Sequence, residues 1–242
     1  MRRLAALMIL TSVPLLAQPY HRRLQVTVRS ELQAAYERAI YDSSVYRAAN
    51  LRRLRPLVPD KNGEVLVATL TSLDDAAGTL ITAQGDGIWV TGVPEVQETC
   101  RQFTGDVVMK VRQLLGLPPD ADVPRVLVLR VAISDIFRPS PDANVTTTMP
   151  CARLSGAPLP ADCGNAYPPT TTPAHYAWMA TDSFILHQLP GGYPWTHLGY
   201  TYNWAPGADR YGASEYVIRT GANALIVENT TPVQYCAAPS AR

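Results

Sequence analysis

The chain of 242 residues carries 21 Lys and Arg against 20 Asp and Glu, a formal net charge of +1 with histidine neutral. A chain with so small an excess of positive charge does not have the basic surface that nucleic-acid binding requires, so nucleic acids are excluded as partners. Apolar residues make up 47% of the chain, enough for one large domain with a hydrophobic core.

The first 17 residues have the three parts of a secretory signal peptide. Arg2 and Arg3 form a positively charged start, residues 4–16 form an apolar run, and the small Ala17 offers a cleavage site. The apolar run is shorter than the ~20 residues that a membrane-spanning helix needs. We therefore expect cleavage after Ala17, and export to the periplasm or the cell exterior of a mature protein that does not span the membrane. Cleavage would leave 19 basic and 20 acidic residues.

Residues 18–58 are predicted to form a helical segment. Ser30 and Gln33 make a capping box. An apolar stripe at helical spacing follows, formed by Leu32, Ala35, Tyr36, Ala39 and Ile40. The helix is expected from about Glu31, and it continues or restarts through Leu54 and ends before Pro56. The most basic stretch of the chain lies here and contains Arg47, Arg52, Arg53 and Arg55. We interpret these arginines as a solvated helix face, with contact to an anionic surface as the alternative.

Residues 59–242 are predicted to form a single α+β domain. Its antiparallel or mixed sheet would have five to seven strands, with helices on at least one face. Early strands are expected at 65–70, 80–82 and 88–91, the last two joined as a hairpin or meander by the Gly85-Asp86-Gly87 turn. A helix over 95–115 would break near Gly105. The apolar run 126–133 indicates a buried strand, in which Arg130 is either an edge residue or a functional one, because an unpaired buried charge is costly.

All four cysteines lie after the expected cleavage site. An even number in an exported chain indicates two disulfide bonds, with three possible connectivities. We favour Cys151 with Cys163, which would staple a polar loop, and Cys100 with Cys236, which would tie the C-terminus to the middle. The spacing contains no Cys-x-x-Cys pair and no flanking histidine at ligand distance, so no metal site is expected.

Residues 134–173 are rich in Pro, Thr, Asp and Cys and are predicted to form a long loop. Loops of this length in compact domains are usually functional or disordered. Arg138 could hold a carboxylate or phosphate, and Asp142 could make turn hydrogen bonds with Asn144, although we expect both to scaffold the loop. Pro173 after Thr172 is expected to start a helix that runs to about residue 188.

The densest aromatic cluster is GGYPWTHLGYTYNW at 191–204. We expect a strand at 196–204. Alternation would place one set of side chains on a single face: Thr196, Leu198, Tyr200, Tyr202 and Trp204. We favour burial of this face, with an aromatic platform for a ring or sugar as the alternative. A ligand would then approach from the side of His197 and Gly199, where Tyr193 and Trp195 are further candidate contacts.

Two closing strands are expected at 215–219 and 224–227, paired across the Gly221-Ala222-Asn223 turn. Glu215 opens the first of them. A carboxylate there could act as a general base, although a charge that guards a sheet edge is commoner. The chain has no standard hydrolase, zinc or nucleotide-binding motif, so no cofactor is expected.

Five segments resemble a group of exported bacterial proteins of unassigned function: IWVTGVPEV, VRQLLGLPP, DIFRPSPD, GYPWTHLGYTYNW and YGASEYVI. The resemblance covers roughly residues 64–236 and implies a shared fold and export, but no reaction. Members tend to read FRPCPDP where this chain has Ser140. The resemblance therefore implies that a family cysteine is missing at Ser140 and that Cys163 has replaced it as the partner of Cys151.

The segment EYVIRTGANALIVENTTP is also similar to the closing hairpin of ADP-ribosyltransferase folds. This resemblance implies that Arg130 would hold the NAD phosphates, Thr196 would shape the nicotinamide pocket and Glu215 would steady the ribose hydroxyls. The chain lacks the usual Ser-Thr-Ser strand and Glu-x-Glu pair. Our leading hypothesis is therefore an exported, non-enzymatic binding or envelope-associated module, which uses 134–173 and 193–204 to contact a small molecule or an envelope partner. An NAD-consuming enzyme is the alternative.

Overall fold

The computed structural model describes residues 20–45, 47, 50–150, 172–183 and 192–239. It has an α+β fold with an antiparallel sheet of eight strands, one more than the upper limit expected. The strands are β1 (Glu64–Thr71), β2 (Leu80–Thr82), β3 (Ile88–Gly92), β4 (Arg125–Ala132), β5 (Ile136–Phe137), β6 (Tyr200–Tyr202), β7 (Tyr211–Ile218) and β8 (Asn223–Thr230). Their order is β2-β8-β4-β1-β3-β7-β5, with β6 paired to β7 beside this path.

Five α-helices lie within the described residues, together with one 3₁₀ turn and one π-helical turn. The helices are α1 (Tyr20–Ser44), α2 (Glu95–Cys100), α3 (Val107–Leu114), α4 (Pro173–Ala177) and α6 (Pro232–Ala237). The turns are the 3₁₀ turn η2 (Ile133–Asp135) and the π-helical turn η4 (Trp178–Ser183). None of the described helices combines the length and the apolar character needed to cross a membrane.

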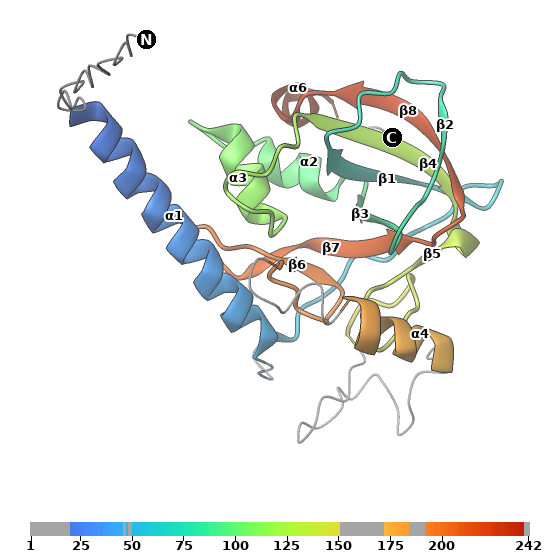
Figure 1. The fold of residues 1–242 in the computed structure, drawn as a ribbon. Coiled ribbons are helices and arrows are strands. Elements are labelled where there is room, and N and C mark those ends of the chain that lie inside the picture. Colours follow the sequence, from blue (N-terminus) through green and yellow to red (C-terminus); the bar gives the residue numbers. More distant parts are fainter. Residues whose placement is uncertain (1–19, 46, 48–49, 151–171, 184–191, 240–242) are drawn as a thin grey trace, which may run out of the picture.

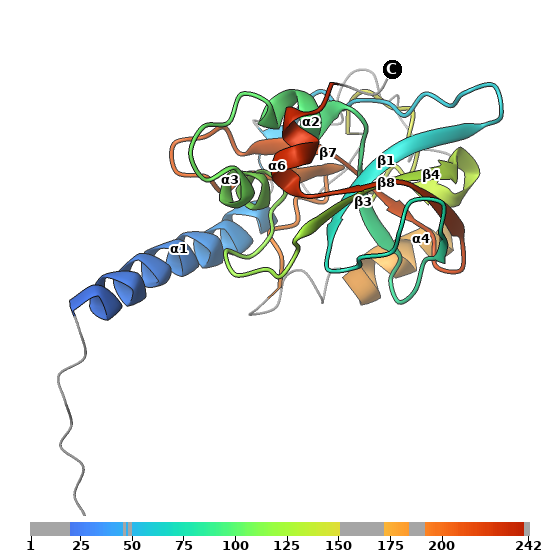
Figure 2. The same cartoon turned by 90° about the horizontal axis from the view of Figure 1, so that it is seen from above.

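The sheet is curled, so that β8, β4 and β1 lie above β7, β6 and β5 in Figure 1. Both ends of the sheet contribute to one inner core, which includes Ile226 of β8, Leu129 of β4 and Ile218 of β7. Other apolar side chains pack against α2, α3 and α6, which lie close together in Figure 2. The apolar run 126–129 in β4 follows from burial on both faces of the strand, whereas Arg130 is exposed.

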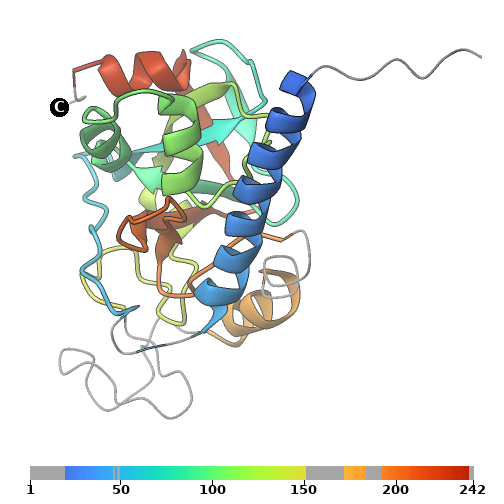
Figure 3. The same ribbon diagram turned by 90° about the vertical axis from the view of Figure 1, so that its left-hand side faces the viewer.

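Helix α1 packs its predicted apolar stripe against aromatic residues at the end of β6 and just after it. Tyr36 and Ala39 are buried against Tyr202 and Trp204, which confirms the stripe. Figure 3 shows α1 along the side of the molecule, with its N-terminal end projecting beyond it. The helix begins at Tyr20 rather than near Glu31.

The predicted continuation of this helix toward Pro56 is wrong. Residues 51–60 have no helical structure. The Leu54 and Leu57 amides donate hydrogen bonds to the carbonyls of Thr148 and Val145, at 2.8 and 2.9 Å. Backbone pairing with a distant segment, together with burial of both leucines, therefore replaces helical hydrogen bonding.

Two predicted hairpins are also wrong. In the described part of the chain β2 pairs with β8, whereas β3 pairs with β1 and β7. Strands β7 and β8 do not pair, because β3, β1 and β4 lie between them. The Gly85 to Gly87 turn carries the chain from β2, at one end of the curled sheet, to the inner strand β3 beside β7. A Cβ at Gly87 would lie 2.4 Å from the Ile218 carbonyl oxygen, so this close passage requires glycine.

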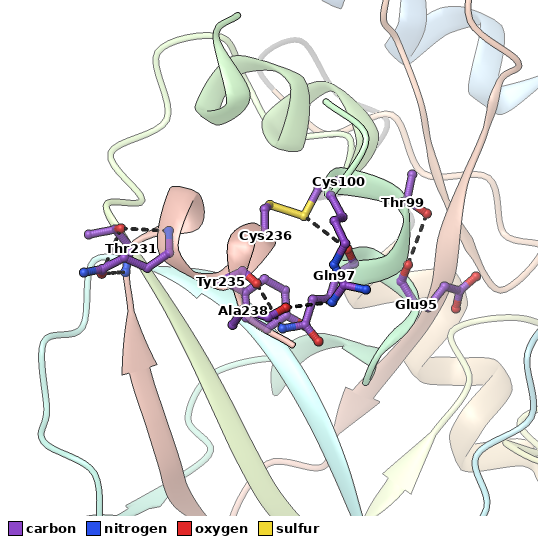
Figure 4. The surroundings of a disulfide bond; sticks show 10 residues. Glu95, Gln97, Thr99, Cys100, Thr231, Tyr235, Cys236 and Ala238 are labelled. Carbon is purple, nitrogen blue, oxygen red and sulfur yellow. Dashed lines mark hydrogen bonds between the residues drawn. A yellow bond between two sulfur atoms is a disulfide. The ribbon is translucent and has the colours of Figure 1, made fainter. Parts of the chain in front are cut away.

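A disulfide joins Cys100 at the end of α2 to Cys236 in α6, which confirms one predicted bridge (Figure 4). The Gln97 side chain donates a hydrogen bond to the Tyr235 carbonyl at 2.9 Å and reinforces this contact. The second predicted bridge, between Cys151 and Cys163, lies outside the described residues, so one disulfide is described rather than two.

The predicted loop at 134–173 contains regular structure at both ends. Phe137 of β5 pairs with Val217 of β7, so the chain rejoins the sheet directly after η2. The predicted helix start at Pro173 is confirmed, because the Thr172 hydroxyl accepts a hydrogen bond from the His175 amide at 3.1 Å. Residues 151–171 and the predicted helix end near 188 lie outside the described part.

Candidate functional site

A cavity of about 450 Å³ lies between the sheet and the segments that precede β4 and β6. Its walls come from β1, β3 and β7, from the turn after α3, and from residues 193–195. Gly116, with φ of +71°, ends α3, and a Cβ there would lie 3.3 Å from the Pro194 ring. The glycine lets the two segments approach and close this wall.

Glu215 brings a carboxyl group to the cavity. Strand register places Glu215 beside Thr91, and Thr91 beside Ala68, so these three residues share one sheet face. The residue as a whole is half-buried, but its Oε2 atom is shielded from solvent and has no hydrogen-bond partner among the described residues. Burial raises the pKa of this carboxyl group to about 8. Glu215 is therefore mainly uncharged at neutral pH.

Two tryptophans line the same cavity. The rings of Trp89 and Trp195 lie edge to face, with centroids 5.9 Å apart. Trp178 of η4 completes the cluster, at 6.0 Å from Trp89 and 6.3 Å from Trp195. The Trp89 indole N–H donates to Asp86, which also lines the cavity, at 3.4 Å. The cavity thus combines flat apolar surfaces with acidic groups.

A tight turn positions Trp195, and it shows that the strand predicted at 196–204 starts too early. His197 has φ of +59° and Gly199 has φ of +80°, so the chain cannot stay extended there. Trp195 pairs instead with Thr201 across the turn. The Thr196 hydroxyl donates to the Tyr200 carbonyl at 2.6 Å and closes the turn. Thr196 therefore has a structural role in the turn and does not line the cavity.

His197 and Tyr193 lie on either side of Trp195. The His197 ring packs on Trp195 with centroids 3.7 Å apart, outside the cavity lining. Tyr193 is 41% exposed and lines the cavity at its rim. Of the binding candidates proposed from the sequence, Tyr193 and Trp195 therefore line the cavity, whereas His197 packs against Trp195 and does not line it.

Arg138 is fully buried and holds the loop together, as expected. Its guanidinium group donates to backbone carbonyls at 3.1 to 3.2 Å, those of Arg55, Asn144, Val145, Thr147 and Gly199. It also lies over the Tyr216 ring, 4.7 Å from the centroid. Asp142 is 2% exposed and accepts the Asn144 amide at 3.0 Å. Neither residue lines the cavity.

The structure does not bring Arg130 and Glu215 into one cavity. Arg130 lies in the inner strand β4, paired with Leu66 and Leu225, so it is not an edge residue. Its side chain is exposed, which avoids the cost of a buried charge, and it lines a second cavity near Glu64. Three strand spacings separate β4 from β7, or ~14 Å.

The aromatic residues that follow the turn form core. Tyr200, Tyr202 and Trp204 are each 3% exposed, which confirms the favoured interpretation. Their polar tips are satisfied: Tyr200 donates to the Asn50 carbonyl, Tyr202 to Asp42, and Trp204 to the Leu117 carbonyl. An aromatic platform at these three residues is therefore excluded by their burial.

Acidic side chains neutralise most of the basic stretch near residue 50. Arg55 contacts Glu98 at 2.6 Å, Arg47 contacts Asp42 at 3.1 Å, and Arg52 contacts Asp209 at 3.8 Å. Three of its four arginines thus have intramolecular partners, which disfavours the anionic-surface interpretation.

Sequence analysis missed Trp89, Trp178 and Asp86 as members of the site. From the sequence, Trp89 is interpreted only as an apolar residue of a strand, and Asp86 only as a turn residue. Trp89 lies two residues before Thr91 on the same face of β3, and only the strand register, which pairs Thr91 with Glu215, brings it near Glu215. No group of three metal-ligating side chains occurs among the described residues. No protein-family model matches the chain, and no curated protein or solved structure gives a significant match.

Proposed function

We propose that the protein is an exported binding protein that holds a small, largely apolar molecule in the cavity beside Trp89, Trp195 and Glu215. The observation that carries this proposal is that Glu215 lines the cavity and has a carboxyl oxygen without a described partner, in a lining that is largely apolar apart from Asp86 and a few hydroxyl groups. Small-molecule sites combine such apolar walls with a few polar groups that orient the ligand. The cavity volume of about 450 Å³ is in the range of such sites.

The export part of the proposal rests on residues 1–17. The Cys100–Cys236 disulfide is compatible with it, because disulfides persist mainly in oxidising compartments. The mass of the protein recovered after expression in a bacterial host tests this part. A protein that begins at Gln18 supports cleavage after Ala17, and an uncleaved chain contradicts it.

Binding is tested with N-phenyl-1-naphthylamine, a neutral probe whose emission rises in apolar surroundings. We expect saturable emission with the unmodified protein and loss of binding in Thr71→Trp, because Thr71 lines the cavity and the larger ring would fill it. Thr82→Trp is the matched control, since Thr82 is exposed on β2 and outside the lining. Absence of saturable binding, or equal binding by both variants, would refute the proposal.

An NAD-consuming enzyme is the second candidate. The observation in its favour is the pKa of Glu215 near 8, which lets this carboxyl group exchange protons at neutral pH. The separation of Arg130 from Glu215 weighs against a shared NAD site. Release of nicotinamide from NAD by the purified protein, lost in Glu215→Gln, would favour this candidate over a binding protein.

A further inference from the structure

The acidic character of the cavity points to the charge of its ligand. Asp86 and Glu215 supply two carboxyl groups to the lining, whereas none of the described lining residues is Lys, Arg or His. The chain as a whole has nearly equal numbers of acidic and basic residues. The described lining therefore holds acidic groups and no basic one, so it offers an anion no ionic partner.

The aromatic walls favour the same charge. The face of an indole ring attracts cations more strongly than any other aromatic side chain does. Trp89 is only half-buried and lines the cavity, so a cation could lie against its ring partly out of water, where this attraction is stronger than at an open surface. Leu70, Leu117 and Val123 supply apolar surface for the remainder of a ligand.

Resting on the proposed function, we infer that the ligand is a small organic cation, an amine or quaternary ammonium compound with an apolar substituent, whose charge lies near Glu215 and the indole ring of Trp89. A buried carboxylate is costly unless it is paired. A cation pairs it, and the indole face of Trp89 and the apolar walls accept the rest of the molecule. A neutral ligand would leave Glu215 protonated and would form no ionic contact with it.

Cation binding should be linked to pH. The titratable groups in the described lining are Glu215 from β7, Asp86 from the turn before β3, and Tyr193 from the segment before β6. The described lining residues that come from β1 and from the connection between α3 and β4 have no titratable side chain. Because burial keeps Glu215 protonated in the empty cavity, a permanent cation must displace that proton, and its affinity should rise as the pH increases through about 8.

The test compares phenyltrimethylammonium with tert-butylbenzene, which has nearly the same shape and no charge. Each compound displaces N-phenyl-1-naphthylamine from the purified protein. We expect roughly tenfold tighter binding of the cation, and tightening from about pH 6 to about pH 9 for the cation only. Glu215→Gln should remove the preference and its pH dependence. Glu64→Gln is the control, since Glu64 lies in β1 outside this cavity and should retain both.

The outcomes separate the two proposals. If the probe binds and both compounds displace it equally, the cation inference is wrong and the binding function stands. Failure of phenyltrimethylammonium to displace a bound probe also overturns the inference. If the probe itself does not bind, the proposed function fails first. A preference that persists in Glu215→Gln would show that Glu215 does not select the cation.

Discussion

At the scale of the residue, two buried ionisable groups differ in how their charge is accommodated. Arg138 is fully buried, yet carbonyl oxygens and the Tyr216 ring surround its guanidinium group. Glu215 has a buried oxygen with no described partner. A buried polar group whose hydrogen bonds are made within the protein stabilises the fold, whereas a group with an unpaired atom is available to bind a ligand. This contrast favours Glu215, and not Arg138, as the residue proposed to contact a ligand.

The raised pKa of Glu215 should make stability depend on pH. Its ordinary value of 4.5 in the unfolded chain lies below the folded value of about 8. The unfolded state therefore loses its proton first, so stability falls as the pH rises from about 4.5 to about 8, by a few kcal/mol in total. Urea unfolding at several pH values should show this decline in the unmodified protein and a smaller decline in Glu215→Gln. Parallel profiles for the two proteins would contradict the assignment.

At the scale of the element, α1 is attached to the body through aromatic packing. Trp204 contacts Tyr36 edge to face, with centroids 5.6 Å apart, and Met109 of α3 packs against the same cluster. The Trp204 indole N–H also donates to the Leu117 carbonyl at 2.9 Å. The turn that builds one wall of the cavity is thereby fixed to the residues beneath α1.

Trp204→Ala should reduce the free energy of unfolding by ~3 to 5 kcal/mol, through lost burial and the cavity left behind. Tyr41→Ala on α1 is the control, because Tyr41 is 74% exposed and its loss should change stability by less than about 0.5 kcal/mol. Thermal melting measures both. A melting temperature for Trp204→Ala within about 2 °C of the unmodified protein would contradict the packing described, since ~1 kcal/mol shifts a domain of this size by ~2 to 4 °C.

At the scale of the whole molecule, the Cys100–Cys236 disulfide links segments separated by 136 residues. It ties α6, at the end of the described chain, to α2 beside the apolar side chains that these helices share with β4. Strands β4 and β8 meet at the same place, with Val126 opposite Thr230. The bridge therefore closes most of the sheet into one covalent loop.

Replacing both cysteines, in Cys100→Ser with Cys236→Ser, should destabilise the protein by ~2 to 5 kcal/mol, because so long a loop restricts the unfolded chain strongly. Urea unfolding measures the change. Alkylation and mass spectrometry of the unmodified protein should find both thiols protected. Reaction of either cysteine without prior reduction would show that the bridge is absent.

The sequence by itself determined the features that depend on neighbouring residues. The stripe around Tyr36, the break at Gly105, the cap at Thr172 and the approximate position of β4 follow from spacing, turn chemistry and a largely apolar run. The pairing of Cys100 with Cys236 was also among the expectations. Each of these signals acts over a few residues, or depends on a small set of possible partners.

The tertiary structure alone decided which distant segments meet. The sheet curls, so the chain after Gly85 crosses from β2 to β3 beside β7, and the chain after Ile218 crosses to β8, although both turns look like hairpins locally. The site follows from that curl: Trp89, Glu215 and Trp195 come together only through the register of β3 with β7 and the turn before β6. Turn residues permit a change of direction, but the burial of two sheet faces selects the partner strand, and that selection depends on the whole chain.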